Sequence, residues 1–225
     1  MAKSVRRVFP SPPTSARALV LRAHPLSDSF NSALADAWAD GARGRGAQVD
    51  VIDVHALEFD PVLHFANRRD EPLEPDLRRV QAAIAEAAHV TVAYPVWWAS
   101  TPAKLKGLFD RVFQTGWAYA AGDGMLPDKG LVGRTGRLLV TMDAPTLYDR
   151  VVYGGSAIRQ VRHGTFHFSG IKPARVSAFG GIEATTPEKR AQMLARARRD
   201  GEKDGARLVK RFGVPGRLPE AVEAA

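Results

Sequence analysis

The sequence predicts one α/β domain with a doubly wound, mostly parallel five-stranded sheet and helices on both faces. Short apolar runs, typical of buried strands, alternate along the chain with segments whose apolar residues repeat at helical spacing. A length of 225 residues fits one domain better than two, and 45% hydrophobic residues suffice for a full core. Neither an internal repeat nor a domain linker interrupts the alternation.

The five expected strands are apolar runs bounded by turn residues or by helical patterns. The first, residues 18–23 (ALVLRA), is followed by a polar loop, and the second, residues 49–54 (VDVIDV), alternates apolar and polar residues. The other three runs are residues 90–94, 138–142 and 174–179. Because helical patterns separate the runs, βαβ units with parallel pairing are expected.

Helical spacing begins at Phe30, and Gly41, Gly44 and Gly46 are expected to end that first helix. Three more helices are expected around residues 77–87, around residues 102–112 and from Pro187 to about Phe212, and residues 158–168 form a helix that leads into the fifth strand. Residues 55–75 and 115–136 are expected to be irregular loops. We expect a disordered basic extension over residues 1–16, a folded domain over 17–212 and a frayed tail over 213–225.

Composition excludes several classes of function. The chain has no cysteine, which excludes thiol nucleophiles, disulfides, iron–sulfur clusters and cysteine-ligated zinc, and its scattered histidines show no metal-ligand spacing. Five positive residues precede the first acidic one, Asp28, so part of the net charge of +8 forms a basic arm without interleaved aromatic residues. Nucleic-acid binding is therefore not expected. No apolar run approaches the ~20 residues of a membrane span and no secretory signal is visible, so a cytoplasmic protein is expected.

Ligands of doubly wound sheets bind at the carboxyl ends of the strands, so the residues after each strand are the candidate site. The first strand is followed by a loop from His24 to Asn31 that opens into a helix and carries neither G-x-G-x-x-G nor a P-loop motif. A helix N-terminus suits a phosphate, and His24, Ser27, Ser29 and Asn31 add side-chain donors. The alternative is that one serine merely caps the helix.

The loops after the third and fourth strands complete the candidate site. Trp97 and Trp98 are costly to expose, and their rigid apolar surfaces suit packing beside a planar ring system, although they could instead cap the core. The loop after the fourth strand contains Thr141, Asp143 and Tyr148, which could approach the same ring from its other side.

Two blocks of this sequence resemble the NAD(P)H:quinone reductase family. The first is His24-x4-Ser29-Phe30-Asn31, and the second begins at Tyr94 and runs YPVWWASTPAKLKGLFDRVF, with Trp117-Ala118-Tyr119 three residues later. The resemblance covers roughly residues 17–180. It implies a flavodoxin-like fold, a tightly bound FAD or FMN, a homodimer, and two-electron transfer from NAD(P)H to a quinone or similar acceptor.

The resemblance also assigns roles to individual residues. Cofactor contacts of the family correspond here to His24, Ser29, Phe30, Asn31, Pro95, Val96 and Trp98, and to these we add Trp97, Thr141, Asp143 and Tyr148 from their loop positions. Tyr119 corresponds to the tyrosine of the acceptor pocket, and His163 could donate a proton because histidine titrates near neutral pH. The chain departs from the family after the fourth strand, where Thr141-Met142-Asp143-Ala144-Pro145 replaces a Thr-Thr-Gly-Gly-like loop. The match of the first loop favours FAD over FMN.

Two other functions are compatible with a flavin site. A one-electron carrier needs a negative surface, which the net charge of +8 opposes. A flavin-bound regulatory protein, such as an ancillary subunit of a potassium-efflux system, would share the fold and the site but would not turn over NAD(P)H. For an enzyme we expect a ping-pong mechanism, because two planar substrates cannot stack on one open face of the flavin together.

Overall fold

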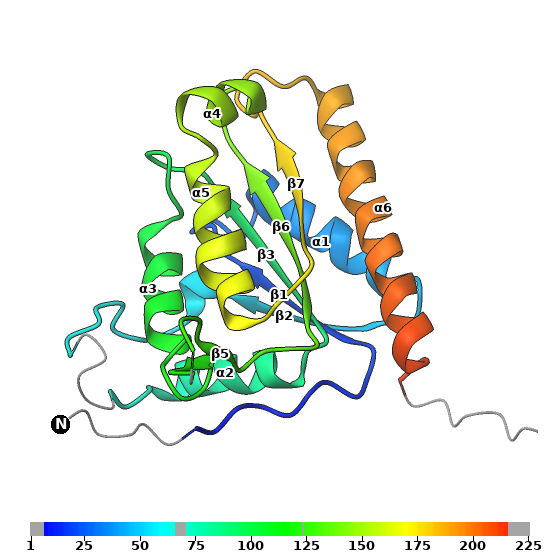
Figure 1. The fold of residues 1–225 in the computed structure, drawn as a ribbon. Helices are drawn as coiled ribbons and strands as arrows, with labels where there is room; N and C mark the ends of the chain where they lie inside the picture. Colours follow the sequence, from blue (N-terminus) through cyan, green and yellow to red (C-terminus); the bar gives the residue numbers. More distant parts are fainter. Residues whose placement is uncertain (1–6, 66–70, 123, 216–225) are drawn as a thin grey trace, which may run out of the picture.

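The computed structural model describes residues 7–65, 71–122 and 124–215, and it shows a layered α/β fold (Figure 1). Five parallel strands form the central sheet in the order β2-β1-β3-β6-β7. Their bounds are β1 (Arg17–Arg22), β2 (Gln48–Asp53), β3 (His89–Pro95), β6 (Thr135–Thr141) and β7 (Ala174–Phe179). This order is the flavodoxin-like one, not the Rossmann order, so the expected fold class is confirmed.

Helices cover both faces of the sheet (Figure 1). One face packs against α1 (Phe30–Arg43) and α6 (Pro187–Phe212). The other face packs against α2 (Pro75–Glu86), α3 (Ala103–Val112) and α5 (Ser156–Arg159), which continues as a π-helical segment, η2 (Gln160–His167). The remaining elements are η1 (Val54–Ala56), β4 (Tyr119–Ala120), β5 (Asp128–Lys129) and α4 (Thr146–Val152). No helix of the described residues is long and apolar enough to cross a bilayer.

The strands agree closely with the sequence-based bounds, and the largest difference has a physical reason. β7 coincides with its expected range, whereas β6 begins three residues before Leu138. Arg137 interrupts the apolar pattern there, yet its guanidinium is buried against Asp204 of α6. An ion pair with a distant helix thus extends the strand through a charged residue.

Gly41 does not end the first helix as expected. It lies inside α1, which ends at Arg43, and a Cβ atom at Gly41 would come within 2.1 Å of the carbonyl oxygen of Arg198 on α6. Gly201 is in the same situation on the other helix, because a Cβ there would lie 2.0 Å from the carbonyl oxygen of Trp38. These glycines let the backbones of α1 and α6 touch, which no other residue type would permit.

Residues 7–16, expected to belong to a disordered extension, instead lie along the lower edge of the domain, while residues 1–6 fall outside the described residues (Figure 1). The amide of Val8 donates to the carbonyl of Gly116 at 2.8 Å, and Ala16 is fully buried. Arg134, also fully buried, donates to the carbonyl of Ser11 at 2.9 Å and to that of Ile84 at 3.1 Å. The segment is therefore held by a residue more than a hundred positions away.

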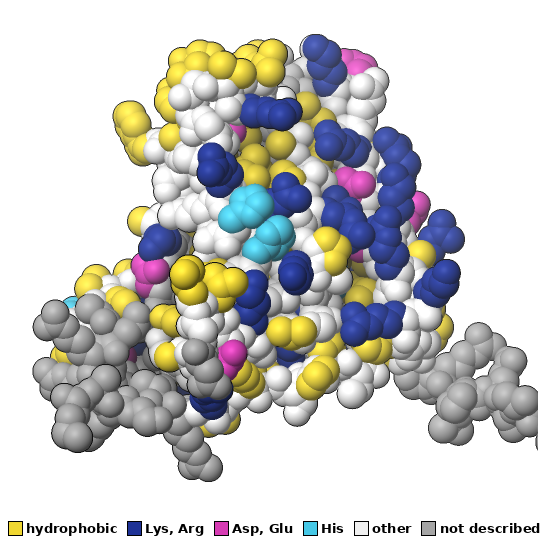
Figure 2. Space-filling view, in the orientation of Figure 1, with side chains coloured by type: hydrophobic (Ala, Val, Ile, Leu, Met, Phe, Trp, Pro, Cys, Tyr) yellow, Lys and Arg dark blue, Asp and Glu magenta, His cyan; other side chains and the backbone are white. Residues whose placement is uncertain are grey.

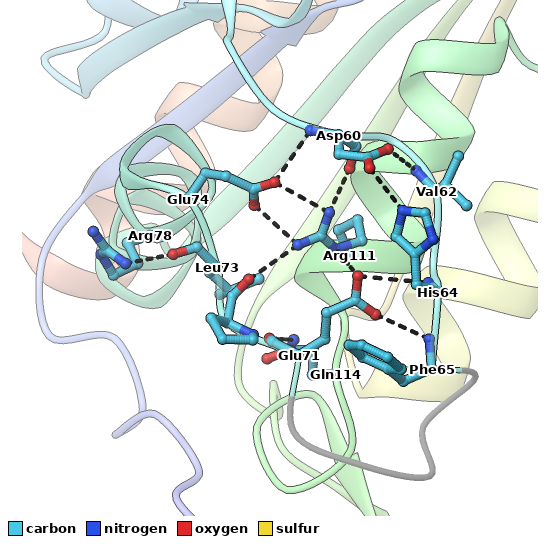
Figure 3. Close-up of polar contacts among 11 residues, drawn as sticks. Asp60, Val62, His64, Phe65, Glu71, Leu73, Glu74, Arg78, Arg111 and Gln114 are labelled. Carbon is cyan, nitrogen blue, oxygen red and sulfur yellow. Dashed lines mark hydrogen bonds and ion pairs between the residues drawn. The ribbon is translucent and has the colours of Figure 1, made fainter.

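The loop before α2 is fixed by one buried arginine (Figure 3). Arg111, on α3, forms an ion pair with Glu74 at 2.9 Å and donates to the carbonyls of Asp60 and Pro72. The loop thereby packs beside α3 although it has little regular structure. In the second expected loop, residues 115–136, β4 and β5 form a short antiparallel pair. Helix α4 was not expected from the sequence.

Candidate functional site

A cavity of about 150 Å³ opens at the carboxyl edge of the sheet. The register explains why its walls meet, because Pro95 pairs with Thr141 and Arg22 with Ala93, so β1, β3 and β6 end side by side. Nine of the eleven predicted cofactor residues line this single cavity: His24, Ser29, Phe30, Asn31, Pro95, Val96, Trp97, Thr141 and Asp143.

The loop after β1 offers donors toward the cavity. The Nδ1 atom of His24 lies 3.1 Å from the amide nitrogen of Leu26 and 3.3 Å from its carbonyl oxygen, so the backbone of Leu26 holds this edge of the ring. Ser29 caps α1, since its Oγ accepts from the amide of Ser32 at 3.2 Å, so the capping alternative holds for this hydroxyl. Within the described residues the amides of Phe30 and Asn31 find no acceptor, as is usual for the first turn of a helix.

Asn31 contains the most informative atom of the site. Its side chain is 3% exposed, and Nδ2 donates to Thr141 Oγ1 at 3.1 Å, which joins the loops after β1 and β6. The other amide atom, Oδ1, is buried without any hydrogen-bond partner in the described part of the chain. A buried unpaired acceptor costs about 1–3 kcal/mol. Because Asn31 lines the cavity, a ligand there with a hydrogen-bond donor would remove that cost.

The loop after β3 is a tight turn from Trp97 to Ser100. The two residues exchange backbone hydrogen bonds of 3.0 and 2.9 Å, and the residues between them, Trp98 and Ala99, have φ values of 52° and 56°. Left-handed backbone at non-glycine residues costs energy and is typical of functional sites. The turn leaves the Trp98 side chain 99% exposed. Trp98 therefore does not cap the core, and no ring within the described chain packs against it.

A second cavity, of about 370 Å³, adjoins the first and shares Val96, Met142 and Asp143 with it. It is also lined by Trp98, Ala99, Ala144, Asp149 and Tyr153. The side chain of Asp149 has no hydrogen bond or ion pair among the described residues, and its burial raises the pKa of that carboxyl. A hydrogen bond with Tyr148 raises the pKa of Tyr153.

Three predicted site residues lie outside the first two cavities. Tyr148, on α4, is half-exposed and packs edge-on against Tyr153 at 5.6 Å. Tyr119 lies beyond the other end of α3 and packs against Phe168, with the ring centroids 5.0 Å apart. His163 is exposed on η2, where its ring lies 4.9 Å from that of His167. Neither proposed catalytic residue therefore lines either of these two cavities, although Tyr119 lines a separate pocket beside Phe168.

Several lining residues were not predicted. Ile182 follows β7, so the rule that ligands bind after the strands would have found it. Met142 lies between two residues that were predicted, and it lines both cavities. Asp149 and Tyr153 belong to α4 and its C-terminal turn, for which the sequence gives no signal.

The residues present fit a flavin. The orphaned Oδ1 of Asn31 suits a ring or hydroxyl donor, and the free amides at the start of α1 suit a phosphate. Trp98 and Ala99 add two amides that find no acceptor within the described residues. Among those residues no group of acidic, histidine or cysteine side chains could hold a metal ion.

Fold and strand order together define a flavodoxin-like protein with a candidate site at the carboxyl edge of its sheet. The family described as "Flavodoxin-like fold" matches residues 16–203. That match covers most of the chain, which therefore belongs to this family.

Individual relatives narrow the comparison. The chain is 28% identical to NAD(P)H dehydrogenase [quinone] 1 of Cavia porcellus, over 80% of this chain and 74% of that protein. It is 27% identical to the solved NAD(P)H:quinone oxidoreductase from Methanothermobacter marburgensis, with a TM-score of 0.72 over 84% of this chain and 96% of the other. An FMN-dependent NADH-azoreductase of Bacillus anthracis, solved with FMN, shares the fold at 15% identity, a TM-score of 0.64, and 85% and 99% coverage.

Proposed function

We propose that this protein is a flavin-dependent NAD(P)H oxidoreductase that transfers two electrons to a quinone or a similar acceptor. The observation that carries the proposal is the unpaired, buried Oδ1 of Asn31, on the wall of a cavity where the loops after β1, β3 and β6 meet. The names of the relatives support the same reaction class. FAD is preferred to FMN only on the resemblance of the first loop.

Each loop has a distinct task in this proposal. The free amides of Phe30 and Asn31 and the ring of His24 hold phosphate, and Asn31 Oδ1 accepts a hydrogen bond from the cofactor. The turn at Trp98 and Ala99 offers amides to the polar edge of the ring. A bound flavin supplies hydride acceptance and hydride donation, and the protein orients the substrates and excludes water.

The turn from Trp97 to Ser100 covers one side of the site, so substrates enter from the other side, over the second cavity. Reductant and acceptor then use the same place in turn. Asp149 lines this second cavity, and burial raises the pKa of its carboxyl above the usual value, so in this proposal it exchanges a proton with the acceptor.

A homodimer is part of the proposal. Tyr119 lines a separate pocket of its own chain beside Phe168, away from the candidate site, so in this proposal it contributes to the site of a second copy. Trp98 and three apolar residues of α4, Leu147, Val151 and Val152, are exposed and would be covered by that copy. Sedimentation at micromolar concentration tests this, and a monomer would contradict it.

The first test is the absorption spectrum of purified protein after reconstitution with FAD or FMN and desalting. We expect one flavin per chain. Substituting Asn31→Ala and Ser29→Ala together should lower flavin affinity about a hundredfold, because charge-assisted and buried hydrogen bonds are lost. Thr186→Ala is the matched control, since Thr186 caps α6 in the same way but lines neither cavity. If Thr186→Ala lowers flavin affinity as much as the Asn31/Ser29 double substitution does, the first loop has only a structural role.

The second test measures initial rates at varied NAD(P)H and several fixed quinone concentrations. Parallel double-reciprocal lines are expected for substrates that alternate in one place, and intersecting lines would contradict that picture. Flavin binding without any turnover would favour the regulatory alternative.

A further inference from the structure

A third cavity, of about 620 Å³, lies between α4, α5 and the edge strand β7. Its apolar lining comes from Leu147, Ile158, Val176 and Ala178. Figure 2 shows hydrophobic side chains at the bottom of a hollow in this face, with Lys and Arg side chains around it. The cavity shares Met142 and Asp149 with the second cavity, so it opens toward the proposed reaction site.

Three arginines line this third cavity, each from a different element. Arg150 comes from α4, and Arg159 and Arg162 come from α5 and the start of η2. Within the described residues none of the three forms an ion pair or a side-chain hydrogen bond, and Arg162 Nε is buried without a partner. Elsewhere Arg17 and Arg111 lie within 3 Å of a carboxylate oxygen. An exposed arginine is ordinarily just solvated, but three unpaired guanidiniums around one apolar hollow indicate an anionic ligand with a flat apolar part.

The proposed function supplies a ligand of that kind. A nicotinamide dinucleotide has an adenine ring, which suits an apolar floor, and phosphates, which suit guanidinium forks. A cavity of about 620 Å³ is within the usual range for small-molecule sites. The pyrophosphate common to both dinucleotides carries two negative charges, and a 2′-phosphate adds about 1.5–2 more. Because the carboxyl of Asp149 also lines the cavity, the preference for NADPH depends on the three guanidiniums and not on net charge: the 2′-phosphate of NADPH offers them acceptors that NADH lacks.

We propose that the arginine-rimmed cavity, formed by Arg150, Arg159, Arg162 and the apolar floor, binds the adenosine 2′-phosphate end of NADPH. This inference rests on the proposed function, because it names the reductant that the same site uses. Through the shared residues Met142 and Asp149, the nicotinamide end extends into the second cavity.

The test uses the full, flavin-reconstituted protein and titration calorimetry with 2′,5′-ADP, 5′-AMP and inorganic phosphate. We expect 2′,5′-ADP to bind at least about tenfold more tightly than 5′-AMP. The double variant Arg159→Ala/Arg162→Ala should weaken 2′,5′-ADP about tenfold or more for each charged hydrogen bond lost. Arg199→Ala, which removes an exposed arginine of α6 that has no partner among the described residues and does not line the cavity, should leave that affinity unchanged.

Steady-state kinetics with both dinucleotides provides a second readout. The double variant should raise KM for NADPH more than KM for NADH, because only NADPH carries the 2′-phosphate, and it should leave the flavin spectrum unchanged. Equal affinity for 2′,5′-ADP and 5′-AMP, or competition by phosphate alone at the same concentration, would overturn the assignment. Missing flavin or missing turnover would instead refute the proposed function, and 2′,5′-ADP binding would still report on the cavity.

Discussion

Two charged regions lie on opposite faces of the same sheet, and they are built on opposite principles. On the α6 face, Asp204 is 2% exposed and accepts hydrogen bonds from Arg137 Nε at 2.5 Å, Arg207 Nη1 at 2.9 Å and Trp38 Nε1 at 3.3 Å. On the α5 face, Asp149 is 3% exposed and has no such partner in the described part of the chain.

The pKa values of the two carboxyls differ accordingly. Burial alone would raise the pKa of Asp204, but the charges of His89, Arg137 and Arg175 outweigh it and lower that pKa. Burial raises the pKa of Asp149 without opposition. Around Asp204 the charged side chains pair with one another and hold α6 against the sheet. Around Asp149 the carboxyl and three arginines have no partner among the described residues, and they lie beside the candidate site. A buried carboxyl with a raised pKa, beside three guanidiniums around one cavity, is a candidate ligand site.

The largest predicted effect is on the paired region. Asp204→Asn should lower the free energy of unfolding by about 3–5 kcal/mol, because it leaves the buried guanidinium of Arg137 without its counter-charge. Urea unfolding measures this change. Asp36→Asn, which breaks the exposed 3.3 Å pair with Arg22, should cost no more than about 1 kcal/mol. Similar losses of unfolding free energy in both variants would show that the ion pairs of Asp204 do not stabilise the fold more than an exposed pair does.

His89 gives the same cluster a pH dependence. Burial, reinforced by Arg137 and Arg175, lowers the pKa of His89 from 6.5 to about 4, although Asp204 opposes the shift. Between pH 4 and pH 6.5 the unfolded chain therefore binds more protons than the folded one. The contribution of neutral His89 to the free energy of unfolding is complete above pH 6.5 and is lost as the pH falls toward 4. It amounts to about 3 kcal/mol.

Unfolding of wild type and His89→Gln by urea between pH 4 and pH 7.5 measures this contribution. The substitution retains a polar group near Thr135, to which His89 Nδ1 lies hydrogen-bonded at 2.7 Å. The free energy of unfolding of the His89→Gln variant should depend less on pH over this interval than that of wild type. Parallel curves for the two proteins would contradict the assignment to His89.

The unpaired region should respond in the opposite direction. Asp149→Asn removes a carboxyl whose folded pKa is raised, which means that wild type loses stability as the pH rises from the unfolded value of 3.8 through the folded value. The variant should melt higher than wild type at pH 7.5, by up to about 2–4 °C, the shift that ~1 kcal/mol produces in a domain of this size. At pH 3 the two should melt together. A lower Tm at pH 7.5 would reveal a partner for Asp149.

The smallest effect is expected from the arginines of the third cavity. Arg159→Ala/Arg162→Ala should change the free energy of unfolding by no more than about 0.5 kcal/mol per site, because neither side chain pairs within the described chain. Thermal unfolding without nucleotide checks this. A large loss of unfolding free energy would show that these arginines stabilise the fold, as the charged residues around Asp204 do.

Sequence reasoning succeeded where a local pattern determines the structure. The apolar run at 174–179 and the helical spacing from Phe30 specify β7 and the start of α1, and the end of each parallel strand marks a wall of the cavity. Nine predicted residues meet there because every such strand delivers its following loop to the same edge.

What the sequence did not predict depends on distant contacts. Residues 7–16 are held by Arg134, and Arg137 extends β6 because Asp204 lies across from it. The seven residues of α4 carry no amphipathic pattern, since most of their apolar side chains are exposed. Burial of Asp149 and the convergence of the arginines follow from where α4 and α5 are placed, which no single segment encodes.

Met142 has a consequence for how such a protein can change. It is 5% exposed and lines all three cavities. Its unbranched side chain adapts to irregular spaces, whereas a branched or aromatic residue at this position would narrow all three at once. A substitution at position 142 that favours a new acceptor would therefore also change how the cofactor and the reductant fit their cavities. Changes that enlarge the range of acceptors are expected to arise first at the outer residues of the second cavity, such as Trp98 or Tyr153, each of which borders one space only.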